Sequence, residues 1–290
     1  MTRRGLNGAL AGVGALLASA CSPLTLFNAL APRDPARREG RDIAYGSDPR
    51  QQLDVYAPEA APAAPLPVLV FFYGGGWNSG RRQDYAWVGQ NLAAQGFVVV
   101  IPDYRLVPQV RYPAFVRDGA AAVRWVQDRV GAFGGDPGRI LLSGHSAGAY
   151  IAMQLAMDQA FLREIGVEPA RIKGVAGLSG PYDFLPFDVP SSRDAFGQWP
   201  DPKDTQPIDH VGPGRPPAFL AHGDKDDTVQ LSNTVNMAKA LREAGDQVEV
   251  KIYPGVDHPG VILALSPLFR GKAPVLADMT AFLRGTSAAA

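Results

Sequence analysis

Three kinds of side chain in this sequence could together activate a serine: Ser146, the aspartates just after Gly223, and His258. A serine hydroxyl is a weak nucleophile until a base takes its proton, and the base needs a carboxylate that fixes its tautomer. Ser146 lies in Gly144-His-Ser-Ala-Gly148, between an apolar run and a helix-like run. A strand, a tight turn with serine at its apex and a helix make up a nucleophile elbow. The pattern predicts acyl transfer to Ser146.

The glycines on either side of the predicted elbow, Gly144 and Gly148, have a steric reason to be there. Side chains at these positions would collide with the neighbouring strand and helix, so hydrogen is what fits. The Ser146 hydroxyl would then stand exposed at a helix N-terminus, where developing negative charge is favoured. A glycine-rich turn with an incidental serine is the alternative interpretation of the motif alone.

Two segments downstream of the serine supply candidates for the acid and the base. Segment 222–229 follows a predicted strand and contains three aspartates: Asp224, Asp226 and Asp227. For two of them, an acidic turn that caps the next helix is the alternative. His258 lies in the loop after the last predicted strand and is the expected base. The other histidines are weaker candidates: His145 lies inside the elbow, His210 in an irregular segment and His222 at a strand end.

A cluster of three glycines, in Tyr73-Gly-Gly-Gly-Trp77, directly follows a predicted buried strand. Glycines let the backbone approach a ligand closely and point N–H groups at it. An oxyanion hole takes one N–H group from such a loop and another from the residue after the nucleophile, here Ala147. The alternative is a flexible turn. Trp77 is expected to pack against the loop rather than to contact a substrate.

The segments that must position these residues alternate between strand-like and helix-like runs. Strands are predicted at 42–46, 51–56, 67–72, 96–101, 140–142, 172–178, 217–222 and 247–253, and helices at 84–95, 112–131, 149–157, 228–244 and 273–284. This alternation predicts an α/β fold with a mostly parallel central sheet and helices on both faces. The irregular segment 185–217 is expected to form a short lid-like insertion that borders the pocket.

Composition limits the classes of protein and of partner. The chain has 290 residues, 46% of them hydrophobic, which suits one large domain, expected at 41–286. A formal net charge of zero provides no basic field for nucleic acid. The four histidines lack the spacing of metal ligands, and a serine mechanism needs no metal or organic cofactor. The single cysteine, Cys21, excludes an intramolecular disulfide.

The N-terminal residues have the layout of an export signal. A pair of arginines precedes an uncharged run at 6–20, which ends in small residues just before Cys21. Small residues before a cysteine resemble the lipobox of bacterial lipoproteins, in which the cysteine becomes the lipid-modified first residue. We therefore expect a lipoprotein-type signal peptide at 1–20, lipid attachment to Cys21, a tether at 21–40 and membrane anchoring at the cell envelope. A plain secretory signal and an uncleaved anchor are the alternatives.

From about Arg41 onward the chain resembles the α/β-hydrolase superfamily. More closely, it resembles carboxylesterases of the hormone-sensitive-lipase type and their relatives, including feruloyl- and acetyl-esterase-like enzymes and isoprenylcysteine methylesterases. The resemblance is carried by segment 73–77, Pro102-Asp-Tyr-Arg-Leu-Val-Pro108, Phe133-Gly-Gly-Asp-Pro-Gly-Arg-Ile140, the elbow 144–148, Asp226 and His258. It implies a serine esterase that acts on a small-molecule or polymer-bound ester, and short acyl groups are expected.

The resemblance also implies a role for each candidate. The triad would be Ser146, Asp226 in the pattern His-Gly-x-x-Asp, and His258, and the oxyanion hole would be Gly75, Gly76 and Ala147. Tyr73 departs from the pattern, because most hormone-sensitive-lipase-type esterases have a histidine there that helps fix the glycine loop. Two other functions remain open: a serine peptidase of the prolyl-oligopeptidase type and a non-catalytic binding module on a hydrolase fold. Aminopeptidase assays and labelling by a serine-reactive phosphonate would separate them.

Overall fold

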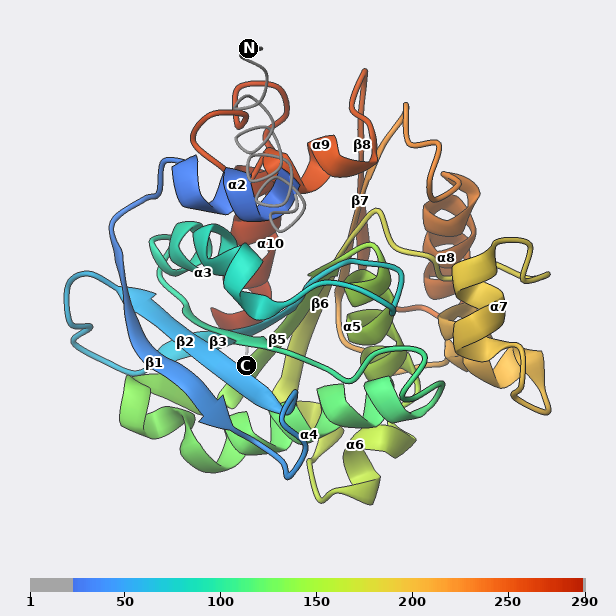
Figure 1. The fold of residues 1–290 in the computed structure, drawn as a ribbon, viewed down its shortest axis with the longest axis horizontal. Helices are drawn as coiled ribbons and strands as arrows, with labels where there is room; N and C mark the ends of the chain where they lie inside the picture. The colour runs from blue at the N-terminus through green and yellow to red at the C-terminus, as the bar shows by residue number, and fades with distance from the viewer. Residues whose placement is uncertain (1–22, 289–290) are drawn as a thin grey trace, which may run out of the picture.

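One mixed sheet of eight strands forms the centre of the computed structural model, which describes residues 23–288 (Figure 1). In chain order the strands are β1 (Ala36–Ala44), β2 (Gln52–Pro58), β3 (Leu66–Phe72), β4 (Val98–Pro102), β5 (Gly135–His145), β6 (Ile172–Leu178), β7 (Ala218–Gly223) and β8 (Val248–Tyr253). Across the sheet they lie in the order β1-β2-β4-β3-β5-β6-β7-β8. The pairs β1–β2 and β2–β4 are antiparallel, and the strands from β4 to β8 in this order are parallel.

Helices cover both faces of this sheet. α4 (Ala114–Arg129) and α5 (Ala147–Met157) pack against each other on one face, and α3 (Ala86–Ala93) and α10 (Val275–Ala288) lie on the other (Figure 1). The remaining helices are α2 (Pro23–Leu30), α6 (Ala160–Glu164), α7 (Pro190–Phe196), α8 (Ser232–Glu243), α9 (His258–Leu263) and the 3₁₀ helices η1 (Arg82–Tyr85), η2 (Val130–Phe133), η3 (Pro169–Arg171), η4 (Pro202–Thr205) and η5 (Pro207–His210). The predicted mostly parallel α/β architecture is confirmed.

The middle strands are apolar on both faces because helices cover both. Every side chain from Val68 to Phe72 in β3 is buried, and so is every side chain from Ile140 to Leu142 in β5. Continuous apolar runs of this kind are typical of parallel strands in an α/β sheet. β1, at the antiparallel edge, instead carries mostly exposed polar and charged residues, which discourage pairing with another chain.

The tether predicted at 21–40 is wrong for the residues that the structure describes. Pro23–Leu30 forms α2, and β1 already begins at Ala36. Phe27 contacts Trp87 edge-to-face, with ring centroids 5.1 Å apart, and Asn28 accepts the backbone N–H of Trp87 over 3.2 Å. These contacts join α2 to a distant part of the chain, so the proline- and arginine-rich composition gives no sign of them. The folded domain therefore begins upstream of the predicted residue 41.

Most other predicted elements are present with shifted ends. The helix expected from residue 228 begins at Ser232, because the N–H groups of Thr228 and Val229 are donated to the side chain of Asp226 instead. The pattern does not predict α6 or α9, which are too short to show a helical period.

Within residues 23–288, no helix combines the length and apolar character that crossing a membrane requires. The signal peptide expected at 1–20 and the lipidation site Cys21 lie outside these residues. Both therefore stay predictions.

Candidate active site

Ser146 lies at the sharp turn between β5 and α5. Its backbone has φ 56° and ψ −125°, a conformation that a non-glycine residue adopts only under strain. A Cβ atom at Gly144 would lie 2.4 Å from the carbonyl carbon of Gly148, and one at Gly148 would lie 2.1 Å from the carbonyl oxygen of Phe72. Close backbone contact therefore requires both glycines, and the turn has the geometry of a nucleophile elbow.

Asp226 and His258 come from different loops and meet in a hydrogen bond. Asp226 follows β7, and His258 begins α9 after β8. Because β5, β7 and β8 are parallel, the loops that follow them open at the same edge of the sheet as Ser146. His258 Nδ1 lies 2.8 Å from Asp226 Oδ2. A carboxylate oxygen accepts here, so Nδ1 carries the proton and Nε2 keeps a lone pair that can accept another.

The surroundings of Asp226 keep its carboxyl group ionised. The side chain is fully buried, and its Oδ1 accepts the backbone N–H groups of Thr228 and Val229 over 3.0 and 2.9 Å. Burial raises the pKa of Asp226, but hydrogen bonds from His258 and from the Val229 amide outweigh burial and lower the pKa to about 2. Asp226 is thus a carboxylate at any pH at which a histidine can act as a base.

The aspartates on either side of Asp226 have other positions. Asp224 Oδ1 accepts the N–H group of Gly255 over 2.7 Å and so holds the turn after β8. Asp227 is exposed and lines the cavity beside Ser146. Of the three candidate acids, Asp226 is the one hydrogen-bonded to His258.

His222, at the end of β7, supports the loop that carries Asp226. Its ring is fully buried, its Nε2 donates to the carbonyl oxygen of Val229 over 2.9 Å, and its Nδ1 accepts from the hydroxyl group of Thr234 over 2.8 Å. Burial lowers the pKa of His222, which favours the neutral ring that these two bonds need. The predicted strand-end position of His222 agrees with the structure.

His145 has a role that the sequence analysis missed. Its Nε2 lies 3.0 Å from the backbone carbonyl oxygen of His258, and a carbonyl oxygen only accepts, so Nε2 carries the proton. Burial, followed by the proximity of the His258 ring, lowers the pKa of His145 to about 3, so the ring of His145 stays neutral. His145 therefore ties the start of α9 to the elbow. Its place next to Ser146 was the only sequence signal, and a motif does not show where a ring points.

The predicted oxyanion residues divide into two groups. Gly76, with φ 55°, and Ala147, the first residue of α5, line the cavity together with Ser146. Gly75, with φ 131°, is not among the lining residues; its carbonyl oxygen accepts the N–H of Ser79 over 3.0 Å, and a Cβ atom there would lie 2.4 Å from the carbonyl oxygen of Ser79. Gly75 thus forms the tight turn of the loop, whereas Gly76 and Ala147 lie at the cavity.

The cavity beside Ser146 has a volume of about 600 Å³. The predicted lid-like insertion 185–217 borders it through residues between Leu185 and Ser192. Trp77 also lines the cavity, and its ring packs edge-to-face on Phe196 of α7, with centroids 4.8 Å apart. Trp77 therefore packs against α7 and also forms part of the cavity wall, a position that was not predicted.

The chemical groups gathered here suit acyl transfer. They are a half-buried serine hydroxyl on an elbow, a histidine oriented by a buried carboxylate, and a glycine loop beside a helix N-terminus. Across the described part of the chain, no group of three or more histidine, cysteine, aspartate or glutamate side chains is arranged to hold a metal ion.

Comparison with known proteins assigns this arrangement to a family. Residues 53–241 match the family model BD-FAE. The chain belongs to the BD-FAE family. It is 31% identical to a probable isoprenylcysteine alpha-carbonyl methylesterase of Oryza sativa, over 87% of this chain and 66% of the relative. It is 32% identical to carboxylesterase NlhH of Mycobacterium tuberculosis, over 79% of this chain and 77% of the relative. A butyrate-bound thermophilic esterase of Thermogutta terrifontis matches with a TM-score of 0.69 and 25% identity, over 85% and 94% of the two chains.

Membership of the BD-FAE family confirms two expectations drawn from the motifs. The chain has the α/β-hydrolase fold, and it is related to carboxylesterases of the hormone-sensitive-lipase type. It spans only 59% to 66% of the lengths of three of the curated relatives that it matches.

Proposed function

We propose that the protein is a serine carboxylesterase that hydrolyses short-acyl carboxylic esters through an acyl-enzyme on Ser146. The observation that best supports this proposal is the 2.8 Å hydrogen bond from His258 to Asp226, at the same sheet edge as the strained elbow that carries Ser146. The esterase names of the relatives support the choice of an ester bond over a peptide bond.

Each residue has a defined part in the proposed reaction. Ser146 Oγ attacks the ester carbonyl carbon while His258 Nε2 takes its proton, and Asp226 stabilises the imidazolium that forms. The N–H groups of Gly76 and Ala147 hold the tetrahedral oxyanion. His258 then gives the proton to the leaving alcohol, which leaves an ester between the acyl group and Ser146. Water attacks this ester by the same steps in reverse and releases the acid.

The preference for short acyl groups is inferred from the cavity wall. Trp77 and Phe184 both line the cavity, and their rings stack with centroids 6.2 Å apart. Phe196 packs on both rings from behind, at 4.8 and 5.3 Å. A wall of aromatic rings that pack on one another resists a long acyl chain, because packed side chains do not accommodate added volume easily. The related esterase of Thermogutta terrifontis was solved with butyrate bound.

A series of p-nitrophenyl esters from acetyl to dodecanoyl tests this proposal directly. We expect kcat/KM to be highest for acyl chains of two to six carbons and at least about tenfold lower for dodecanoyl, because each added methylene must find apolar space in the cavity. Activity that rises steadily to dodecanoyl would contradict the short-acyl preference. Failure to hydrolyse any ester in the series would contradict the esterase assignment.

We further propose that the protein is exported and anchored to a membrane by a lipid on Cys21. The support is the charged, apolar and small-residue order of the first 21 residues. We expect Cys21→Ser to prevent lipid incorporation and to move the protein from the membrane fraction to the soluble fraction, while its esterase activity stays within about twofold of wild type. Incorporation of radiolabelled palmitate and fractionation measure both effects. A Cys21→Ser chain that stays membrane-bound would refute lipid anchoring.

A further inference from the structure

The glycine loop, defined as Gly74–Ser79, lies against the elbow. A Cβ atom at Gly74 would lie 3.1 Å from the Cβ atom of Ser146. Inside the loop, the carbonyl oxygen of Gly75 accepts the N–H groups of Asn78 and Ser79 over 3.2 and 3.0 Å, so the loop is one closed turn. A closed turn of this kind is oriented by what holds its two ends.

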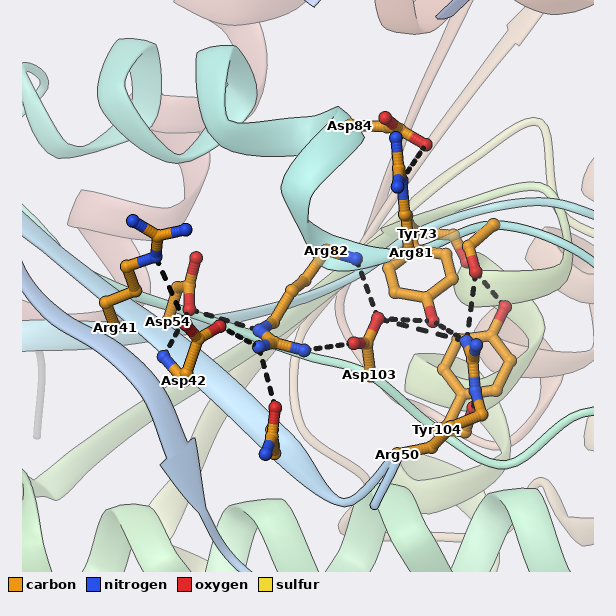
Figure 2. A network of polar contacts seen from close by, with 12 residues as sticks. Arg41, Asp42, Arg50, Asp54, Tyr73, Arg81, Arg82, Asp84, Asp103 and Tyr104 are labelled. Atoms are coloured by element: carbon orange, nitrogen blue, oxygen red, sulfur yellow. Dashed lines mark hydrogen bonds and ion pairs between the residues drawn. The ribbon is translucent and has the colours of Figure 1, made fainter. Parts of the chain in front are cut away.

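Tyr73 fixes the first end of the glycine loop. Its ring is buried and stacks on Tyr85 and Tyr104, with centroids 5.4 and 4.8 Å away. Its hydroxyl group donates to Asp103 Oδ1 over 2.8 Å and accepts from Arg50 Nη2, also over 2.8 Å (Figure 2). Burial and the charge of Asp103 raise the pKa of Tyr73 well above its usual value, so the phenol keeps the proton that it donates.

The same two partners hold the other end of the loop. Arg50 Nη2 also donates to the carbonyl oxygen of Gly80 over 2.9 Å, and the backbone N–H of Arg82 donates to Asp103 Oδ1 over 2.7 Å. A single carboxylate oxygen of Asp103 therefore joins Tyr73, just before the loop, to Arg82, just after it (Figure 2). The glycine loop is clamped at both ends by one carboxylate and one guanidinium group.

Asp103 is in turn held by a cluster of charges around the buried side chain of Arg82. The side chain of Arg82 is only 3% exposed and makes ion pairs with Asp103, Asp54 and Asp42 (Figure 2). Buried ion pairs add little net stability because the cost of desolvation offsets their attraction. Removing one partner is nevertheless destabilising, because it leaves the other charge buried without a counter-charge. Such a cluster is better suited to fixing one geometry than to stabilising the fold.

We propose that Tyr73, Asp103 and Arg50 are positioning residues of the oxyanion hole. They fix the position of the glycine loop relative to the elbow, so that the N–H group of Gly76 points at the oxyanion. They do not contact the substrate themselves. This inference rests on the proposed function. The hydroxyl group of Tyr73 is the part of its side chain that reaches the carboxylate of Asp103.

The inference predicts a specific kinetic signature. An oxyanion contact is made mainly in the transition state, so a displaced loop lowers kcat more than it weakens substrate binding. We expect Tyr73→Phe, which removes only the hydroxyl group, to lower kcat for p-nitrophenyl butyrate about 10- to 100-fold and to leave KM within about twofold. We also expect the Ki of a trifluoromethyl ketone, whose hemiketal oxyanion occupies the same hole, to rise by the same factor as kcat/KM falls.

Two further variants make the test decisive. Tyr253→Phe is the matched control, because it removes another tyrosine hydroxyl that donates to a carboxylate, Asp278, over 3.0 Å, and Asp278 lies on α10 away from the loop. It should lose thermal stability without the change in kcat and Ki. Arg50→Gln, at a half-buried site, should also lower kcat and raise Ki while leaving KM nearly unchanged. This variant tests the same role should the Tyr73→Phe protein fold poorly.

The outcomes separate this inference from the proposed function. Suppose that the wild type is active. An unchanged kcat and Ki in Tyr73→Phe and Arg50→Gln, or a change in KM alone in these variants, would then overturn the positioning role and leave the proposed function in place. Equal effects in Tyr253→Phe would overturn the positioning role as well, because the loss would then reflect general destabilisation. A wild type that neither hydrolyses the ester nor binds the ketone would refute the proposed function, and the positioning role with it.

Discussion

Replacing Ser146 by alanine is expected to lower kcat for p-nitrophenyl butyrate by about 10⁴-fold or more, because the acyl-enzyme can no longer form. The residual rate would come from substrate binding and the oxyanion hole. A fluorophosphonate, which forms a covalent bond to an activated serine, should label the wild-type protein at a single site. Intact-protein mass spectrometry of both chains should show one adduct in wild type and none in Ser146→Ala.

Ser191→Ala is the matched control for this experiment. Ser191 lines the same cavity, but it lies in α7 and not at a strand-to-helix elbow. It should keep activity within about threefold of wild type and should still be labelled. If labelling persists in Ser146→Ala and disappears in Ser191→Ala, Ser191 and not Ser146 is the nucleophile. A wild type that resists the phosphonate would favour the non-catalytic binding module.

The elbow could be predicted from the sequence because the residues that define it are local. The two glycines, the serine and the flanking runs lie within a short stretch, although the contact that excludes a side chain at Gly148 is made with the distant Phe72 of β3. The order of serine, acid and base along the chain was likewise available, since parallel strands place successive loops at one sheet edge. Which of the three aspartates turns inward came only from the resemblance to the pattern His-Gly-x-x-Asp. The residues alone do not decide it, because the choice depends on how two N–H groups close the turn around Asp226.

Contacts between distant segments were beyond the reach of the pattern. The clamp on the glycine loop joins Arg50, Tyr73 and Asp103, and none of these residues has a charge or apolar spacing that reveals the others. Tyr73 stood out only as a departure from a family pattern. The N-terminal tether was predicted for the same reason: α2 carries no charge and is short, and its place is set by the contact of Phe27 with Trp87.

The choice among the aspartates leads to the second large effect. Asp226→Asn should lower kcat by about 10³- to 10⁴-fold, although the structure around it changes little. The asparagine Oδ1 can still accept the N–H groups of Thr228 and Val229, but its NH₂ group would donate to His258 Nδ1. His258 would then carry its proton on Nε2, the atom that must accept the proton of Ser146. The chain would fold with a histidine in the wrong tautomer.

Asp227→Asn makes the same chemical change one residue away and serves as the control. Because Asp227 is exposed and lines the cavity, its charge is screened by solvent, and we expect kcat to stay within about threefold of wild type. Any effect should appear in KM for charged substrates. Steady-state kinetics and thermal melts of both variants distinguish loss of chemistry from loss of fold. Equal losses of kcat in the two variants would contradict the assignment of the acid to Asp226, since only the Asp226 carboxylate reaches the ring of His258 among the three candidates.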